Sequence, residues 1–172
     1  MCGFAGYLSE KIDSNLEIVS KMVDRVNSRG PDSNGFWLDP NNSYSVGHKR
    51  LSILDLSDSG HQPMLSSDSR YVLAYNGEIY NHLELRECLN KEKIIDWDGT
   101  SDTETLIKAI EIWGLEKTLI NLNGMFAFAL WDRKNEILNL VRDRFGEKPL
   151  YYGFVNDAIV FGSQLKCFLD FP

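Results

Sequence analysis

The chain has 172 residues, 43% of them hydrophobic and 25% charged, which predicts a single globular domain and excludes a disordered chain. Its 25 acidic and 18 basic side chains give a formal net charge of −7, which argues against nucleic-acid and membrane-surface partners. No apolar run approaches the roughly 20 residues of a membrane span, and the start lacks a secretory pattern, so we expect a cytoplasmic protein. Three scattered cysteines predict neither a disulfide framework nor a zinc site.

The first half of the chain predicts one helix among short strands. Apolar residues recur at helical spacing over 14–27, and Asp13 or Ser14 is placed to cap that helix. Asp, Ser, Gly and Pro dominate the later stretch 57–69, which is typical of a loop. Strands are expected over 2–8, 35–39, 43–48 and 71–75.

The second half predicts two helices and then four strands. Asn81 is placed to cap a helix over 81–90, and Ser101 with Glu104 forms a capping-box pattern at the start of a helix that ends at Gly114. Strands are expected over 125–131, 137–141, 150–155 and 158–162, joined by short turns as an antiparallel meander. Because the strand over 125–131 is apolar on both faces, it needs a layer on each side. The pattern therefore indicates an α+β fold with two stacked antiparallel sheets and helices outside.

Cys2 is the residue that most strongly suggests chemistry. Its position alone predicts a small, buried, apolar side chain in the first strand. If Met1 is removed, however, Cys2 carries both a thiol and a free α-amine, whose pKa of about 7.7–8.0 leaves a useful fraction as free base at neutral pH. A nucleophile with its own base needs no histidine partner.

Several ordered motifs resemble the class II, or N-terminal nucleophile, glutamine amidotransferases, and among them the glutaminase domain of glutamine-dependent asparagine synthetases. The motifs are Met-Cys-Gly-Phe-Ala-Gly at 1–6, Arg-Gly-Pro-Asp at 29–32, Arg-Leu-Ser-Ile at 50–53, Asn-Gly-Glu-Ile-Tyr-Asn at 76–81, Ser-Asp at 101–102, Gly-Met-Phe-Ala-Phe-Ala at 124–129 and Arg-Asp-Arg-Phe-Gly-Glu-Lys-Pro-Leu-Tyr-Tyr at 142–152. The resemblance implies one glutaminase domain over 1–172, a four-layer αββα sandwich, and hydrolysis of L-glutamine to L-glutamate and ammonia through a Cys2 thioester.

The resemblance also assigns roles to particular residues. It implies that Asn76 and Gly77 form the oxyanion hole, although an Asn-Gly pair by itself predicts a tight turn. It implies that Arg50 grips the α-carboxylate of glutamine, a contact that suits a planar guanidinium. The remaining implied contacts are the α-ammonium group with Asp102 and Glu78, and backbone contacts from Leu51 and Ile53. Without the family, Asp102 reads as an acidic residue favoured by a helix N-terminus.

The resemblance further implies a partner that uses the ammonia. Full-length asparagine synthetases carry a second, synthetase domain with a pyrophosphate-binding loop, and no such loop occurs here. We therefore expect ATP and magnesium only in that missing domain or in a separate synthetase subunit, and no cofactor or metal in this chain. A second copy of the chain, in a homodimer, is a further expected partner. The alternative acceptors are a sugar acid or another carboxylate of a cell-surface polymer. Alternative functions are a non-catalytic binding module and an amidohydrolase for another amide.

The other cysteines and the histidines are expected to be structural. Cys88 shares a predicted helix face with Leu85 and Leu89 and is expected in the core. Cys167 lies in a terminal amphipathic stretch and is expected to be structural. His48 and His82 read as structural or surface residues, with a Cys–His dyad as the competing mechanism for activating Cys2.

Overall fold

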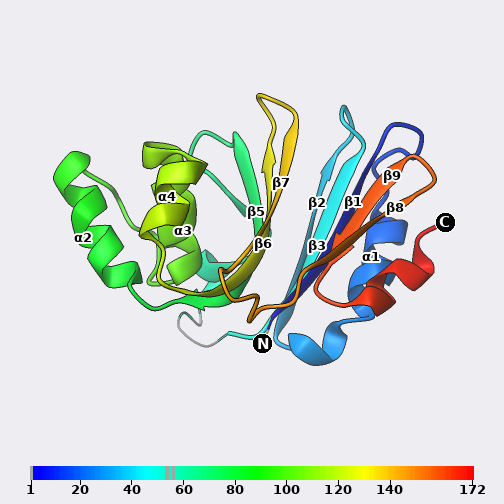
Figure 1. Cartoon of the computed structure of the whole chain (residues 1–172), viewed down its shortest axis with the longest axis horizontal. Coiled ribbons are helices and arrows are strands. Elements are labelled where there is room, and N and C mark those ends of the chain that lie inside the picture. Colours follow the sequence, from blue (N-terminus) through cyan, green and yellow to red (C-terminus); the bar gives the residue numbers. More distant parts are fainter. Residues whose placement is uncertain (1, 53–54, 56) are drawn as a thin grey trace.

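The computed structural model describes residues 2–52, 55 and 57–172. Figure 1 shows two antiparallel sheets that pack face to face, with helices covering the outer face of each. The expected α+β class and four-layer αββα sandwich are thereby confirmed.

The element bounds follow chain order. The helices are α1 (Leu16–Asp24), α2 (His82–Glu92), α3 (Asp102–Trp113) and α4 (Leu115–Asn121), with the 3-10 helices η1 (Asn27–Arg29), η2 (Asp58–Gly60) and η3 (Leu165–Asp170). The strands are β1 (Gly3–Ser9), β2 (Ser33–Asp39), β3 (Tyr44–Arg50), β4 (Met64–Leu65), β5 (Tyr71–Ile79), β6 (Gly124–Asp132), β7 (Ile137–Arg142), β8 (Tyr151–Val155) and β9 (Ala158–Gly162). Sheet A has the order β2-β3-β1-β9-β8, and sheet B has the order β4-β5-β6-β7.

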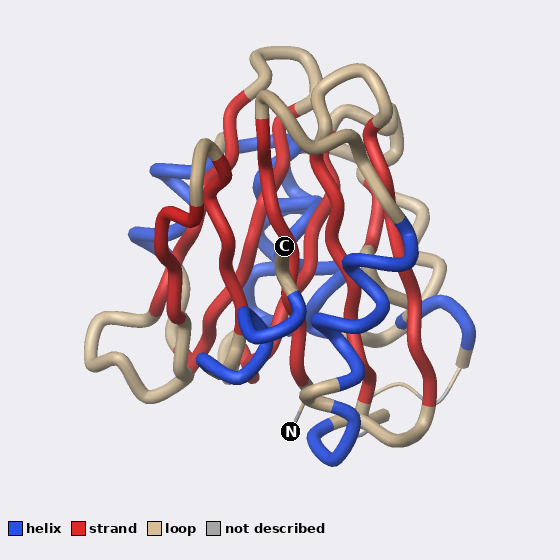
Figure 2. The backbone as a smooth tube through the Cα atoms, turned by 90° about the vertical axis from the view of Figure 1, so that its right-hand side faces the viewer, coloured by secondary structure: helices blue, strands red, loops and turns tan. Residues whose placement is uncertain are grey.

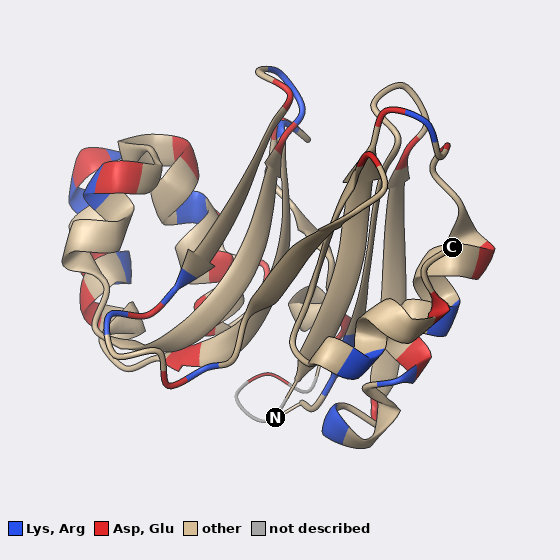
Figure 3. Ribbon diagram, turned by 45° about the vertical axis from the view of Figure 1, so that its right-hand side comes forward, with Lys and Arg blue, Asp and Glu red and all other residues tan. Residues whose placement is uncertain are grey.

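Strand β6 shows why the sandwich has four layers. Phe126, Phe128 and Leu130 face the helices α3 and α4, whereas Ala127 and Trp131 face sheet A. Side chains at successive positions of a strand point to opposite faces, so a strand that is apolar at every position requires cover on both sides. On the other side of the molecule, α1 and η3 lie across the outer face of sheet A (Figure 2). Charged side chains gather on helices and loops, while the strands are mostly uncharged (Figure 3).

The expected meander over the last four strands is wrong. β6 and β7 pair in sheet B, but β8 and β9 pair in sheet A, so the chain changes sheet between them. Asp143 fixes this crossing: its carboxylate accepts hydrogen bonds from the backbone N–H groups of Phe126, Phe145, Glu147 and Lys148 at 2.9–3.2 Å. The short connection after β7 therefore joins the two sheets rather than two neighbouring strands of one sheet.

Helix caps agree with the sequence only in part. The Ser101 hydroxyl accepts from Glu104 N (3.2 Å) at the start of α3, as expected, but the Glu104 carboxylate bonds the backbone N–H groups of Asp98 and Gly99 rather than closing a capping box. Asn15, not Asp13 or Ser14, caps α1. Asn81 stands at the N-cap position of α2 but makes no side-chain cap bond, because its amide bridges Asn121 O and Asn123 N instead.

Strand register brings the start of the chain to the end of β3. β1 lies at the centre of sheet A, and Gly3 pairs with Lys49, so Cys2 stands beside the segment that begins at Arg50. The N-terminal end of β1 lies at the edge of the sandwich where the two sheets meet (Figure 1). No helix among the described residues has both the length and the apolar character needed to cross a bilayer.

Candidate active site

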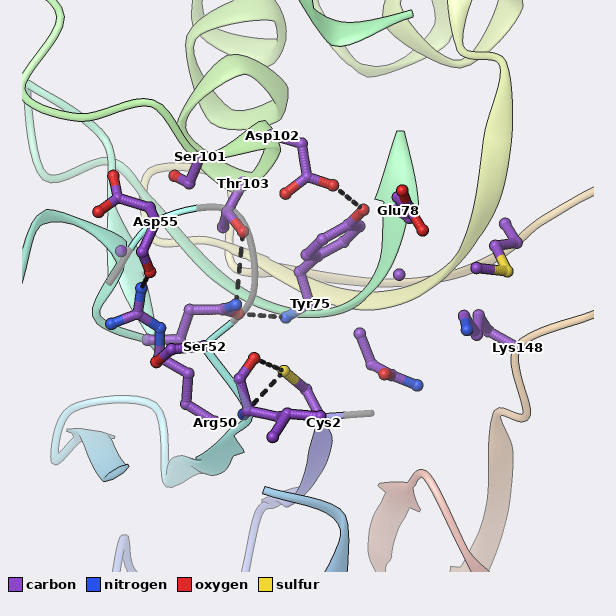
Figure 4. Close-up of a pocket in the computed structure, with 16 residues that line it drawn as sticks. Cys2, Arg50, Ser52, Asp55, Tyr75, Glu78, Ser101, Asp102, Thr103 and Lys148 are labelled. Atoms are coloured by element: carbon purple, nitrogen blue, oxygen red, sulfur yellow. Dashed lines mark hydrogen bonds between the residues drawn. The ribbon is translucent and has the colours of Figure 1, made fainter. Parts of the chain in front are cut away.

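One cavity of 140 Å³ opens at this edge between the two sheets. Figure 4 shows Cys2 at one side of it, Asp102 at the opposite side and Arg50 on a flank. Seven of the residues predicted from the sequence line this cavity: Cys2, Arg50, Leu51, Asn76, Gly77, Glu78 and Asp102. Ile53, the eighth, lies outside the described residues.

Cys2 is held against the backbone of Leu51. Its Sγ accepts a hydrogen bond from Leu51 N (3.3 Å) and donates to Leu51 O (3.6 Å), and Arg29 Nε donates to the Cys2 carbonyl (2.9 Å). Burial raises the pKa of the Cys2 thiol, and the hydrogen bond from Leu51 N only partly opposes this. The resting group is therefore a neutral thiol at pH 7, and attack on a carbonyl requires a base.

Asn76 and Gly77 lie inside β5, paired with Ala127 and Phe126, so the tight-turn interpretation of this pair is wrong. Asn76 is buried, and within the described part of the chain its Nδ2 has no hydrogen-bond partner. A buried amide N–H without a partner costs free energy, which marks it as a donor for something absent from the chain itself.

Within the described residues, the backbone N–H of Gly77 also lacks a hydrogen-bond partner. Phe126, its cross-strand partner, directs both its N–H and its C=O to Asp143, so the Gly77–Phe126 pair exchanges no ladder bonds. The Gly77 N–H therefore points off the open edge of β5. On the same edge, two residues to either side, Tyr75 N donates to Gln62 Oε1 (2.7 Å) and Ile79 N donates to Asp102 Oδ2 (2.9 Å). The N–H of Gly77 lies between them, at the cavity.

Arg50 is fixed by the loop that follows β3. Its Nη1 donates to Ser57 O (2.9 Å) and its Nη2 to Asp55 O. Two of the five N–H groups of the guanidinium are thus used. Among the described residues the other N–H groups have no hydrogen-bond partner, so they are available to a ligand in the cavity that Arg50 lines.

Asp102 is the first residue of α3, as its helix-terminus interpretation requires, and it also faces the cavity. Its Oδ2 accepts from Tyr75 Oη (2.6 Å) and Ile79 N (2.9 Å). Both interpretations of Asp102 are therefore compatible with its position. Glu78 is exposed and lies on the cavity wall.

Several cavity residues were not predicted from the sequence. Tyr75 holds Asp102, Gln62 bonds the backbone of Tyr75, and buried Lys148 stands across the cavity from Arg50 (Figure 4). Gln62 and Lys148 come from loops; Lys148 belongs to the motif at 142–152, but no pattern in the sequence assigned it a role in the site. Among the described residues, no group of three or more His, Cys, Asp or Glu side chains is arranged to hold a metal ion.

His48 takes no part in a Cys–His dyad. It is fully buried, and its Nε2 bonds Tyr75 O (2.9 Å) across the two sheets. Within the described residues, the hydrogen bonds of Cys2 Sγ are both to Leu51. Cys167 is buried, which agrees with a structural role. The expectation of a buried Cys88 is wrong: it is exposed, because α2 turns only Leu85 and Leu89 inward.

Protonation of His48 is expected to destabilise the fold. Burial lowers its pKa to about 4, against about 6.5 in an unfolded chain. The unfolded state therefore binds the extra proton first, and stability is lost as the pH falls from about 6.5 to about 4. Between pH 7 and pH 5 the wild type should lose about 2 kcal/mol more than His48→Gln. Urea unfolding at both pH values measures this, and equal losses would contradict it.

Comparison with known proteins places this geometry in a family. A family profile described as a glutamine amidotransferase domain matches residues 1–172. Asparagine synthetase [glutamine-hydrolyzing] 1 of Bacillus subtilis is 39% identical over 171 residues, which are 96% of this chain and 26% of that protein. A putative asparagine synthetase of Mycobacterium bovis is 42% identical over 185 residues, covering 99% of this chain and 28% of that protein. Amidase chyE of Penicillium rubens is 37% identical, covering 99% and 26%. The chain thus spans about a quarter of the length of these relatives.

A solved structure shares the fold. The glutamine phosphoribosylpyrophosphate amidotransferase of B. subtilis aligns with a TM-score of 0.78 and 23% identity, over 97% of this chain and 43% of that one. At this identity the likeness concerns the arrangement of sheets and helices alone.

Proposed function

Since the chain belongs to the glutamine amidotransferase family, we propose that residues 1–172 form a glutaminase domain that hydrolyses L-glutamine to L-glutamate and ammonia through a thioester on Cys2. The observation that carries the proposal is that one cavity brings together a half-buried thiol, a guanidinium, a carboxylate and two N–H donors of β5 that have no partner among the described residues. These are the groups needed to attack an amide and to hold an α-amino acid at both ends.

The first half-reaction makes the thioester. Removal of Met1 leaves the α-amine of Cys2 as the base, which takes the Sγ proton while sulfur attacks the side-chain amide carbon of glutamine. The carbonyl oxygen becomes an oxyanion that accepts from Asn76 Nδ2 and Gly77 N. When the C–N bond breaks, the α-ammonium returns the proton to the leaving nitrogen, and ammonia departs.

The second half-reaction releases glutamate. The free α-amine takes a proton from water, whose oxygen attacks the thioester carbon, and the same two N–H donors hold the second oxyanion. The C–S bond then breaks and sulfur regains the proton. Nucleophile, base and oxyanion donors all come from the chain, so the proposed hydrolysis uses no cofactor.

Two measurements test the proposal. Intact mass should show Met1 removed, and the purified protein should then release glutamate and ammonia in equal amounts from glutamine. A protein that fully retains Met1, or one without Met1 that releases no glutamate, would contradict the proposed mechanism.

We further propose that the ammonia is passed to an ATP-dependent synthetase domain or subunit, where ATP and magnesium would act. Support comes from the relatives named as asparagine synthetases, which extend well beyond the matched segment. The second candidate is hydrolysis of an amide other than glutamine, favoured by the similarity to a protein named as an amidase. Ammonia release from glutamine and from other amides, measured side by side, distinguishes the two candidates.

Glutamine binding is expected to depend on both ends of the cavity. We expect Arg50→Ala and Asp102→Ala each to lower kcat/KM by about ten- to a hundred-fold, because a charged, partly desolvated contact contributes roughly 1.5–3 kcal/mol. The double variant should be less than additive, since a substrate loose at one end gains less from the other contact. Glutamate release against glutamine concentration measures all four proteins.

The rate of Cys2 alkylation by iodoacetamide is the control for these variants, because neither side chain is proposed to activate the thiol. It should change little in either variant. If glutamate release by Asp102→Ala depends on glutamine concentration as in the wild type, Asp102 is only a helix-terminal residue. Glu78 would then be the residue to test as the partner of the α-ammonium group.

A further inference from the structure

The Asp55 carboxylate connects the loop after β3 with the segment before α3. Its Oδ1 accepts from Ser57 N (2.8 Å) and Ser57 Oγ (2.6 Å), and its Oδ2 accepts from Thr100 N (2.8 Å). Asp55 is buried and lines the cavity, yet no contact with a reacting group requires it. We propose that Asp55 is a positioning residue that orients Arg50 for the substrate carboxylate; this inference rests on the proposed glutaminase function.

The link to Arg50 runs through two backbone carbonyls. Ser57 N and Ser57 Oγ both donate to Asp55 Oδ1, which holds Ser57 close to Asp55. The backbone carbonyls of these same two residues accept from Arg50: Asp55 O from Nη2 and Ser57 O from Nη1. An Arg side chain has several rotatable bonds, and fixing them before the ligand arrives avoids an ordering cost at binding. Asp55 therefore pre-organises the guanidinium without touching it through its carboxylate.

The second link anchors Asp55 to the segment that begins α3. Thr100 lies one residue before the Ser101 cap of α3, and its segment is also held by Arg86, which donates to Gly99 O and Ser101 O (2.9 Å each). Because Asp55 Oδ2 bonds Thr100 N, the loop that carries the Arg50 contacts is fixed to the helix that begins with Asp102. The two ends of the proposed glutamine site are thereby linked by hydrogen bonds through Asp55.

The ionised form of Asp55 persists throughout the range of an enzyme assay. Hydrogen bonds from Ser57 and Thr100 lower the pKa of its carboxyl to about 2. Asp55→Asn is therefore an informative variant: it keeps the shape and one oxygen, but places an NH2 group against one of the donors. Asp58→Asn, which alters an exposed neighbour outside these contacts, is the matched control.

The expected result is a change in binding. Arg50 would hold glutamine equally in the ground and transition states, so Asp55→Asn should raise KM about five- to twenty-fold and keep kcat within about twofold. Alkylation of Cys2 by iodoacetamide and the activity of Asp58→Asn should match the wild type. Arg50→Ala should lower kcat/KM less in the Asp55→Asn background than alone, because the contact is already impaired.

Other results would overturn the inference. An unchanged KM in Asp55→Asn would show that Asp55 is dispensable for binding. A joint fall of kcat, of the Cys2 alkylation rate and of Tm in that variant would show that Asp55 only stabilises the fold. If Asp55→Asn does not fold, Ser57→Ala decides: loss of the 2.6 Å contact should raise KM about two- to five-fold at unchanged kcat, and an unchanged KM refutes the proposal. If the wild type hydrolyses glutamine and the variants behave like it, only the inference about Asp55 is refuted. If the wild type is inactive although Met1 has been removed, the proposed glutaminase function is refuted as well.

Discussion

The Cys2→Ala variant is expected to lose glutamine hydrolysis, with kcat falling by about 10⁴-fold or more, because no other atom can form the thioester. The substitution deletes one sulfur at a partly buried position and leaves the Arg29 bond to the Cys2 carbonyl in place. The fold should therefore persist, with Tm close to that of the wild type. Glutamate release and thermal unfolding on the same preparation measure the two effects separately.

Cys88→Ala is the matched control for this variant. It removes an exposed thiol on α2, away from the cavity lining, and should leave both activity and Tm unchanged. Substantial glutamate release by Cys2→Ala would refute covalent catalysis by this thiol, and would direct attention to hydrolysis by activated water in the same cavity.

The Asn76→Ala variant should lower kcat by about 10²–10³-fold and leave KM within about threefold, since the oxyanion exists only after attack. The structural reason is the buried Nδ2 of Asn76, which has no partner within the described residues. Removing it leaves one donor, the Gly77 N–H at the open edge of β5. Steady-state kinetics over a full range of glutamine concentrations separate the two constants.

Asn76→Asp sharpens this experiment. It preserves the shape of the side chain but replaces a donor with a negative oxygen beside a developing negative charge, so kcat should fall further than in the alanine variant. A change confined to KM in both variants would show that Asn76 binds glutamine rather than stabilising the oxyanion.

Local patterns along the chain predicted most of the secondary structure. Helical spacing and the Ser101 cap located α3, and the uninterrupted apolar run of β6 predicted a layer on each of its faces. These features depend on residues close together in the sequence, so the sequence alone was sufficient to predict them. α4 escaped prediction, since it continues from Gly114 with no separate capping signal.

The site was predicted through its motif residues, and the geometry that links them was not. The Asn76-Gly77 pair favours a turn by local propensity, but pairing with β6 over nine residues overrides that preference, and β5 continues through the pair without interruption. Likewise, Asp55 and Tyr75 resemble ordinary loop and strand residues, and their bonds to Thr100 and Asp102 span 45 and 27 positions.

The sequence by itself determined the residue types available for chemistry: a thiol at Cys2, a guanidinium at Arg50 and a carboxylate at Asp102. Only the tertiary structure decided which groups are free to act. Strand order leaves the edge of β5 open beyond β4, so the Gly77 N–H faces a cavity rather than another strand. Burial keeps Cys2 a neutral thiol and His48 a neutral base bonded to Tyr75 O, because desolvation disfavours the charged form of each.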